Sequence, residues 1–270
     1  MKYRSLFFYL IPSVLILFSC STGNPDKVKY LNFETSLGDI KLKLYNETPG
    51  HKENIIKLTK EGFYDGIKFH RIINEFMIQA GDPGTKEGTT ETSNEQYNYT
   101  IPAEINASLF HKKGVLAAAR TGDRFNPERE SSGTQFYIVQ GRPMTDEELN
   151  ASEQRINSAL QQGIYYKNLM AEKKRVVDEG DPMTDAEIQQ LATLVSYDEI
   201  TAMEPYVIPE ERREVYRTLG GTPHLDRQYT VFGEIVEGQD VVDAIASVAV
   251  DQYNKPLEDI VIIKAKITKK

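Results

Sequence analysis

Hydrophobic residues alternate with polar ones at several places along the chain, which is the pattern of half-buried β-strands. Ile40, Leu42 and Leu44 form one such stretch and residues 36–39 supply a turn before it, so residues 28–45 are predicted to be a β-hairpin. Further strands are predicted at residues 114–119, 135–139, 230–236 and 260–267. Residues 114–119 are small, residues 135–139 are rich in aromatic and β-branched side chains, and residues 260–267 again alternate apolar and polar side chains. An apolar run within residues 69–82 predicts one more strand, and the chain is therefore predicted to be mainly β.

Two short helices are predicted beside these strands. Thr48 and Pro49 are residues favoured at a helix start, and Gly62 follows an apolar face, so a helix is predicted between them. The second is predicted at residues 240–246. Many short strands with two helices predict a closed antiparallel barrel whose ends the helices cap.

Residues 143–222 depart from the strand pattern. Their apolar residues recur at helical spacing, and Thr145 and Thr184 each stand three residues before a glutamate, which is the signature of a capping box. We interpret these two similar segments as a duplicated helix-start motif and not as a true internal repeat. An all-α insertion of about 80 residues into a β domain at residues 29–270 is therefore predicted.

The formal net charge of −8 is concentrated in this insertion. Residues 143–222 hold 16 acidic and 8 basic residues, whereas the rest of the chain holds 24 of each. The acidic insertion is therefore a candidate surface for a protein partner, although a solvated subdomain without a partner explains the charge equally well. No basic stripe is present, so no nucleic-acid binding is predicted.

The first twenty residues have the pattern of a secretory signal. Lys2 and Arg4 precede an apolar run at residues 6–18, which is short for a membrane span. Residues 17–20 (Leu-Phe-Ser-Cys) resemble a bacterial lipoprotein box, in which Cys20 would be lipidated. Cys20 is the only cysteine, which excludes a disulfide within one chain.

We therefore expect residues 1–20 to be a lipoprotein signal peptide and residues 21–28 to be a polar tether. The domain is expected in the cell envelope, in the periplasm, held to a membrane through its N-terminal lipid. The alternative is a buried cysteine within an uncleaved anchor helix. That alternative also places the domain outside the cytosol.

Four segments resemble, in order, the signatures of the cyclophilin family of peptidyl-prolyl isomerases. They read FHRIINEFMIQAGD at 69–82, GVLAAAR at 114–120, SSGTQFYI at 131–138 and YTVFGEIV at 229–236. The resemblance covers most of residues 29–270. It implies a cyclophilin-like barrel of eight strands and two helices, and a peptidylprolyl isomerase (EC 5.2.1.8) that acts on proline-containing polypeptides. Typical members have a much shorter connection where residues 143–222 lie.

The chemistry of proline isomerisation fits the residues of the first segment. Rotation about an X–Pro bond faces a barrier of about 18–20 kcal/mol, because amide resonance must be lost. No covalent bond is made or broken, so neither a nucleophile nor a metal or cofactor is required. The nitrogen of the twisted amide gains a lone pair, and a cation that donates to it only in the transition state accelerates rotation. Arg71 is the candidate donor, because arginine keeps its charge beside apolar residues.

The resemblance implies roles for further residues. Phe76 and Gln79 would complete the catalytic set with Arg71, and Gln79 would hold the guanidinium in place. The substrate-binding residues implied in this way are Met77, Ala119, Arg120, Gln135, Tyr137, Leu225 and Tyr229.

Several of these positions depart from the family pattern. Tyr137 stands where phenylalanine is common, which would add a hydroxyl at the pocket rim, and Tyr229 stands where many members have histidine. Arg120 replaces the usual asparagine, which puts a side-chain role at that position in doubt. His224 stands where several eukaryotic members carry tryptophan.

Other interpretations remain open from the sequence. Arg71 could pair with Glu75 on the surface, and Phe76 and Met77 could be core residues. The leading hypothesis is an active isomerase for exported proteins. The alternatives are a cyclophilin-fold chaperone or client-binding module that uses the acidic insertion, and a purely structural envelope lipoprotein.

Overall fold

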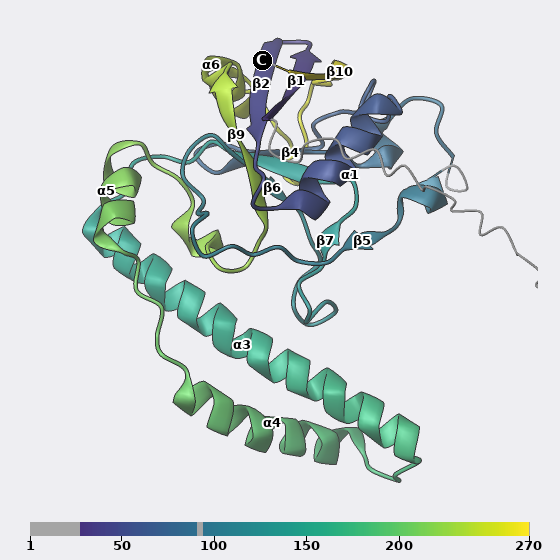
Figure 1. Ribbon diagram of the computed structural model, residues 1–270, viewed down its shortest axis with the longest axis vertical. Helices are drawn as coiled ribbons and strands as arrows, with labels where there is room; N and C mark the ends of the chain where they lie inside the picture. Colours follow the sequence, from purple (N-terminus) through teal and green to yellow (C-terminus); the bar gives the residue numbers. More distant parts are fainter. Residues whose placement is uncertain (1–27, 91–93, 270) are drawn as a thin grey trace, which may run out of the picture.

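The computed structural model describes residues 28–90 and 94–269. The predicted signal peptide, the lipidation site Cys20 and nearly all of the tether lie outside the described residues. Eight strands form one antiparallel sheet, in the spatial order β10-β1-β2-β9-β6-β8-β4-β3 (Figure 1). These strands are β1 (Lys29–Thr35), β2 (Gly38–Leu44), β3 (Arg71–Ile73), β4 (Met77–Ala80), β6 (Val115–Ala118), β8 (Phe136–Val139), β9 (Val231–Glu237) and β10 (Ile262–Thr268). A separate two-stranded ladder pairs β5 (Thr100–Ile101) with β7 (Ser131–Ser132).

The closed barrel predicted from the sequence is an open, curled sheet. Its edge strands, β3 and β10, form no ladder with each other. One isolated bridge pairs Lys68 with Val261 beside these edges, and a few backbone hydrogen bonds join residues 66–69 to 260–262. Because β3 is only three residues long, it ends the sheet before a full ladder can form.

The register of four neighbouring strands separates a core face from a site face. Ile72, Ile78, Ile138 and Leu116 are cross-strand partners on β3, β4, β8 and β6, and all are buried in the main core. The next row holds Arg71, Gln79, Tyr137 and Ala117 on the same strands. Successive side chains of a strand point to opposite faces, so this second row lies on the other side of the sheet.

The two helices predicted beside the barrel are α1 (Pro49–Lys60) and α6 (Gln239–Ala246). Thr48 is at the N-cap of α1 as predicted, but its side chain accepts no capping hydrogen bond. Glu104 takes that role instead: its carboxylate accepts from the backbone N–H groups of Gly50 (3.0 Å) and His51 (2.9 Å). A carboxylate is well placed there because the helix dipole is positive at this end.

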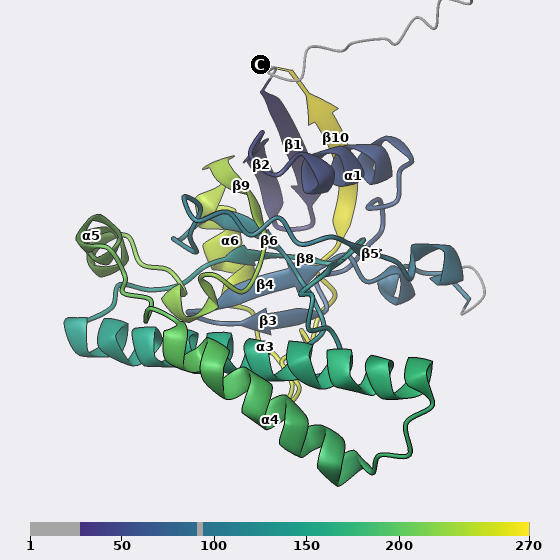
Figure 2. The same ribbon diagram turned by 60° about the horizontal axis from the view of Figure 1, so that its bottom comes forward.

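Residues 143–222 hold three α-helices. They are α3 (Asp146–Glu179), α4 (Asp185–Ala202) and α5 (Glu210–Thr218). Both predicted capping boxes are present, Thr145 with Glu148 and Thr184 with Glu187. The α3 and α4 helices lie side by side and extend beyond the curled sheet in both views (Figures 1 and 2).

The helical segment 143–222 contacts the β domain along both α3 and α5. Near the start of α3, Leu149, Ile208 and Tyr216 form a small buried core against which Phe110 of the β domain packs. Farther along α3, the Arg129 guanidinium donates to the Ala159 carbonyl at 3.1 Å and to Asp123 at 2.8 Å. Gly163 faces this guanidinium, and an added Cβ there would lie only 2.4 Å from it.

Candidate active site

The segment predicted as one strand at residues 69–82 is a tight hairpin. Its turn includes Glu75, which has a positive φ of 61°. The Glu75 backbone N–H donates to the Gln140 side chain at 2.5 Å. The hairpin makes Arg71 and Gln79 direct cross-strand partners, and the Arg71 Nη1 donates to the Gln79 Oε1 at 3.3 Å.

A cavity of about 290 Å³ opens on the site face of this hairpin. Nine of the ten predicted catalytic and substrate-binding residues line it: Arg71, Phe76, Met77, Gln79, Ala119, Arg120, Tyr137, Leu225 and Tyr229. Met77 and Tyr137 are buried, at 2% and 5% exposure, and belong to one hydrophobic cluster. The structure thus brings these residues together around an apolar floor, while their roles remain predictions.

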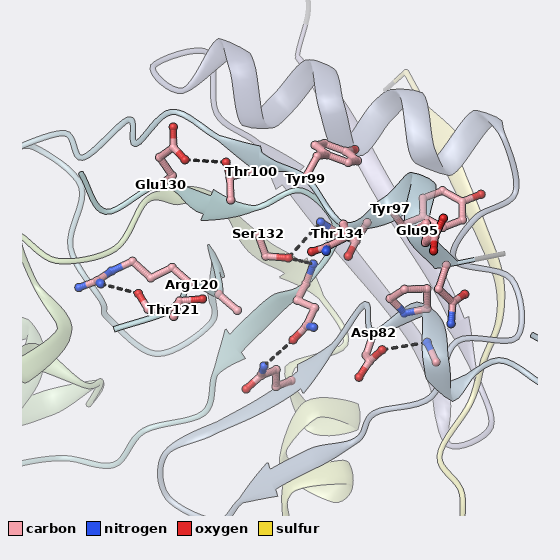
Figure 3. A pocket seen from close by; sticks show the side chains of 17 residues that line it. Asp82, Glu95, Tyr97, Tyr99, Thr100, Arg120, Thr121, Glu130, Ser132 and Thr134 are labelled. Atoms are coloured by element: carbon pink, nitrogen blue, oxygen red, sulfur yellow. Dashed lines mark hydrogen bonds between the residues drawn. The ribbon is translucent and has the colours of Figure 1, made fainter. Parts of the chain in front are cut away.

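The tenth predicted residue, Gln135, lines a larger neighbouring cavity of about 580 Å³ (Figure 3). This larger cavity shares Gln79, Ala119 and Arg120 with the smaller one. The Gln79 Nε2 donates to the Gln135 Oε1 at 3.1 Å, so the two cavities are connected by a side-chain hydrogen bond. That bond turns the other amide atom of Gln79, its Oε1, toward Arg71.

The Arg71 guanidinium is exposed at the cavity rim. Among the described residues, no carboxylate lies within 4.0 Å of it, and Gln79 is its hydrogen-bond partner. Glu75, the alternative partner considered from the sequence, pairs with Arg142 instead at 3.3 Å. The guanidinium therefore keeps donors available for a ligand in the cavity.

Arg120 and Tyr229, two departures from the family pattern, contact each other. The guanidinium lies 4.6 Å from the centre of the Tyr229 ring. Arg120 also donates to the Gln228 carbonyl at 2.8 Å and pairs with Asp123 at 2.5 Å, and its side chain is 3% exposed. These contacts hold the Arg120 guanidinium against the Tyr229 wall of the cavity.

A buried polar network of four side chains lies behind the cavity, and sequence reasoning missed the part that three of them play in it. The His111 ring is 2.9 Å from Asp226 through Nδ1 and 3.0 Å from the Tyr137 hydroxyl through Nε2. The Tyr216 hydroxyl of α5 donates to the other Asp226 oxygen at 2.8 Å. Because a carboxylate oxygen accepts, Nδ1 carries the imidazole proton and Nε2 accepts from Tyr137.

This network changes the interpretation of Tyr137. Its hydroxyl was expected at the pocket rim, but it points to buried His111 and leaves the ring to the cavity. Burial raises the pKa of Tyr137 well above its ordinary value, so the hydroxyl keeps the proton that it donates. His111 and Asp226 are 115 positions apart in the chain, so no local pattern pointed to them.

His224 forms the outer part of the Phe76 wall. Its ring is stacked on Phe76 at 5.4 Å between ring centres, with 27° between the planes. Burial is the main cause that lowers the pKa of His224 to about 4, and the positive charge of Arg155 contributes. The imidazole is therefore neutral at physiological pH and behaves as an aromatic wall.

Comparisons with known proteins agree with this arrangement. The family model "Cyclophilin type peptidyl-prolyl cis-trans isomerase/CLD" matches residues 30–159 and 211–267, and residues 160–210 fall between the matched parts. A protein of Staphylococcus aureus (strain USA300) named "Putative peptidyl-prolyl cis-trans isomerase" is 31% identical over 229 residues, which are 84% of this chain and 86% of that protein. A protein of the same name from Staphylococcus haemolyticus (strain JCSC1435) is 29% identical over 229 residues, with 84% and 85% covered.

Solved structures show the same fold. A Cryptosporidium parvum cyclophilin type peptidyl-prolyl cis-trans isomerase superposes with a TM-score of 0.54 at 18% identity, covering 90% of this chain and 99% of that one. The same protein in the presence of the dipeptide Ala-Pro gives a TM-score of 0.53. The fold is thus cyclophilin-like.

The chain belongs to the cyclophilin-type peptidyl-prolyl cis-trans isomerase family. The predicted enzyme class, peptidylprolyl isomerase, is confirmed, and the comparisons do not favour the alternative of a client-binding module. Within residues 28–90 and 94–269, no helix has both the length and the apolar character needed to span a bilayer.

Removing the Tyr137 hydroxyl is expected to destabilise the fold, because Tyr137→Phe leaves the buried His111 Nε2 without its donor. An unpaired buried polar group costs about 1–3 kcal/mol. Urea unfolding monitored by circular dichroism would measure this loss. Tyr253→Phe removes a hydroxyl from a side chain that is 76% exposed, and should have almost no effect. Equal stabilities of the two variants would show that the network contributes nothing.

The lowered pKa of His224 predicts a pH dependence of stability. The unfolded state takes up this proton near pH 6.5 and the folded state only near pH 4, so stability falls as the pH drops between these values. At pH 5 the loss attributable to His224 is about 2 kcal/mol relative to pH 7.5. The difference in unfolding free energy between wild type and His224→Gln should change by that amount. Parallel pH profiles of the two proteins would contradict the prediction.

Proposed function

We propose that this enzyme accelerates rotation of X–Pro bonds in exported polypeptides, with Arg71 as the donor to the proline nitrogen of the twisted amide. The observation that carries the proposal is the exposed Arg71 guanidinium, which lines the apolar cavity and has no carboxylate partner within 4.0 Å among the described residues. A guanidinium already neutralised by a carboxylate would have to break that pair before it could act.

The surrounding side chains suit a proline ring and a peptide backbone. Met77, Tyr137 and Leu225 offer apolar surface to the ring, and Phe76 closes one side against His224. The proline ring of the substrate makes these contacts equally well whether the X–Pro amide is planar or twisted. The contacts therefore strengthen substrate binding but do little to lower the barrier to rotation. The hydrogen bond from Arg71 strengthens as amide resonance is lost, and only such a differential interaction lowers the barrier.

Gln79 acts on the reaction by positioning Arg71. Its amide is held between the Gln135 side chain and the guanidinium, at 3.1 and 3.3 Å. Gln135 is itself fixed, because its backbone N–H donates to the Ser132 hydroxyl at 3.1 Å. Preorganised donors of this kind need little rearrangement at the moment of reaction.

The proposed substrates follow from the N-terminal sequence. We propose that Cys20 carries a lipid that anchors the enzyme to a membrane of the cell envelope, with its domain in the periplasm. The support is the order of a basic start, a short apolar run and a single cysteine, followed by a short polar segment. An enzyme held there would meet polypeptides as they fold after export. The helical segment 143–222 is proposed as an insertion in this enzyme.

Replacing the proposed donor should abolish most of the activity. Arg71→Ala is expected to lower kcat/KM for a proline-containing tetrapeptide by roughly 10²–10³-fold, the loss typical of one preorganised transition-state donor. A protease-coupled or NMR exchange assay measures the rate. Arg124→Ala, at an exposed arginine that does not line the cavity, is the matched control and should keep wild-type turnover.

Two outcomes would contradict this proposal. Equal turnover of Arg71→Ala and wild type would remove the guanidinium from the mechanism. Absence of turnover in the folded wild-type protein would remove catalysis itself.

The lipid anchor is testable in whole cells. The full-length protein should incorporate a labelled fatty acid and partition into the detergent phase of a Triton X-114 separation. Cys20→Ser should lose both properties, because the thiol is the only lipid attachment point of this kind in the chain. Labelling that persists in Cys20→Ser would contradict the anchor.

A further inference from the structure

A third cavity lies beside Phe76. Its volume is about 390 Å³, and it lies between the β3–β4 turn and the first turns of α3. Phe76 lines both this cavity, here called the α3 pocket, and the proline cavity. His224, stacked on Phe76, also lines the α3 pocket. A peptide bound over Phe76 can therefore place a neighbouring residue in the α3 pocket.

Four charged side chains line the α3 pocket, and three of them are joined by ion pairs, one arginine with two glutamates. Arg142 pairs with Glu75 at 3.3 Å and donates to both carboxylate oxygens of Glu148. The Arg142 hydrogen bond, with a second from the Thr145 backbone, lowers the pKa of Glu148 to about 2. Glu148 is thus ionised at neutral pH and stays paired with Arg142.

Arg155 is the fourth charged residue of the α3 pocket, and it takes no part in these ion pairs. It is exposed, and among residues 28–90 and 94–269 no carboxylate lies within 4.0 Å of its guanidinium. Its positive charge reaches the neighbouring imidazole, where it contributes to the lowered pKa of His224. The α3 pocket therefore offers an arginine that has no carboxylate within 4.0 Å among the described residues, beside a neutral aromatic wall.

We propose that the α3 pocket is a substrate subsite for an acidic side chain near the isomerised proline, with Arg155 as its specificity-determining residue. The proposal rests on the proposed isomerase function. A guanidinium matches a carboxylate with two parallel hydrogen bonds, so aspartate or glutamate is the ligand that it selects. An extended chain advances about 3.3 Å per residue, which places the acidic residue within about three positions of the proline.

Through this subsite, the helical insertion would contribute to substrate specificity. Arg155, Glu148 and Ser152 all belong to α3, so the α3 pocket would not exist without that helix. The insertion is acidic as a whole and repels acidic peptides at long range. A free arginine beside the active cavity selects the carboxylate locally, where it is positioned by the bound proline.

The experiment uses a set of proline peptides that carry glutamate, glutamine or lysine at each of three positions before and after the proline. Wild type should turn over one glutamate peptide about twofold to fivefold faster, as kcat/KM, than its glutamine counterpart, the range expected for a partly exposed ion pair. Arg155→Glu should reverse that ranking and favour lysine at the same position. Lys167→Glu, also on α3 and exposed but outside the pocket, should leave the ranking unchanged.

The outcomes separate this proposal from the proposed function. A reversal in Arg155→Glu alone supports the subsite, because a general structural defect would not invert a charge preference. Turnover without any charge preference at all six positions overturns the subsite and leaves the isomerase intact. If no peptide is turned over, the proposed function fails, and fluorescence anisotropy with the same peptides decides whether Arg155 still selects glutamate in binding.

Discussion

The hydrogen-bonded register of β3, β4, β8 and β6 is the constraint on which the site depends. It places Arg71, Gln79, Tyr137 and Ala117 in one row and the buried Ile72, Ile78, Ile138 and Leu116 in the next. A slip by one residue would exchange the two rows, bringing a guanidinium into the core and isoleucines to the cavity. The burial of the isoleucine row therefore fixes the geometry of the polar row.

The buried carboxylate of Asp226 links the helical segment 143–222 to this sheet. Asp226 accepts hydrogen bonds from the His111 backbone, the His111 ring and the Tyr216 hydroxyl, and the His111 ring in turn accepts from Tyr137. All four side chains are almost fully buried. A buried network of this kind is costly when any partner is missing, so it favours one relative position of α5 and the cavity. Segment 143–222 is thereby connected to the floor of the cavity.

Sequence reasoning succeeded where the determining signals were local. Most strands of the large sheet and both capping boxes followed from short-range patterns, and nine of the predicted site residues line one cavity, while their roles stay predictions. It failed where distant residues meet. The hairpin turn at Glu75, the open sheet edge, the capping of α1 by Glu104 and the His111–Asp226 pair each depend on contacts that no local pattern encodes.

The contact between Arg120 and Tyr229 makes the two positions dependent on each other. Exchanging the tyrosine alone for histidine would leave the guanidinium over a smaller ring that can itself become charged, and like charges repel. Exchanging the arginine alone for asparagine would leave Asp123 with Arg129 as its one remaining cation among the described residues. The two side chains are therefore energetically coupled, and the effects of replacing them are not expected to add.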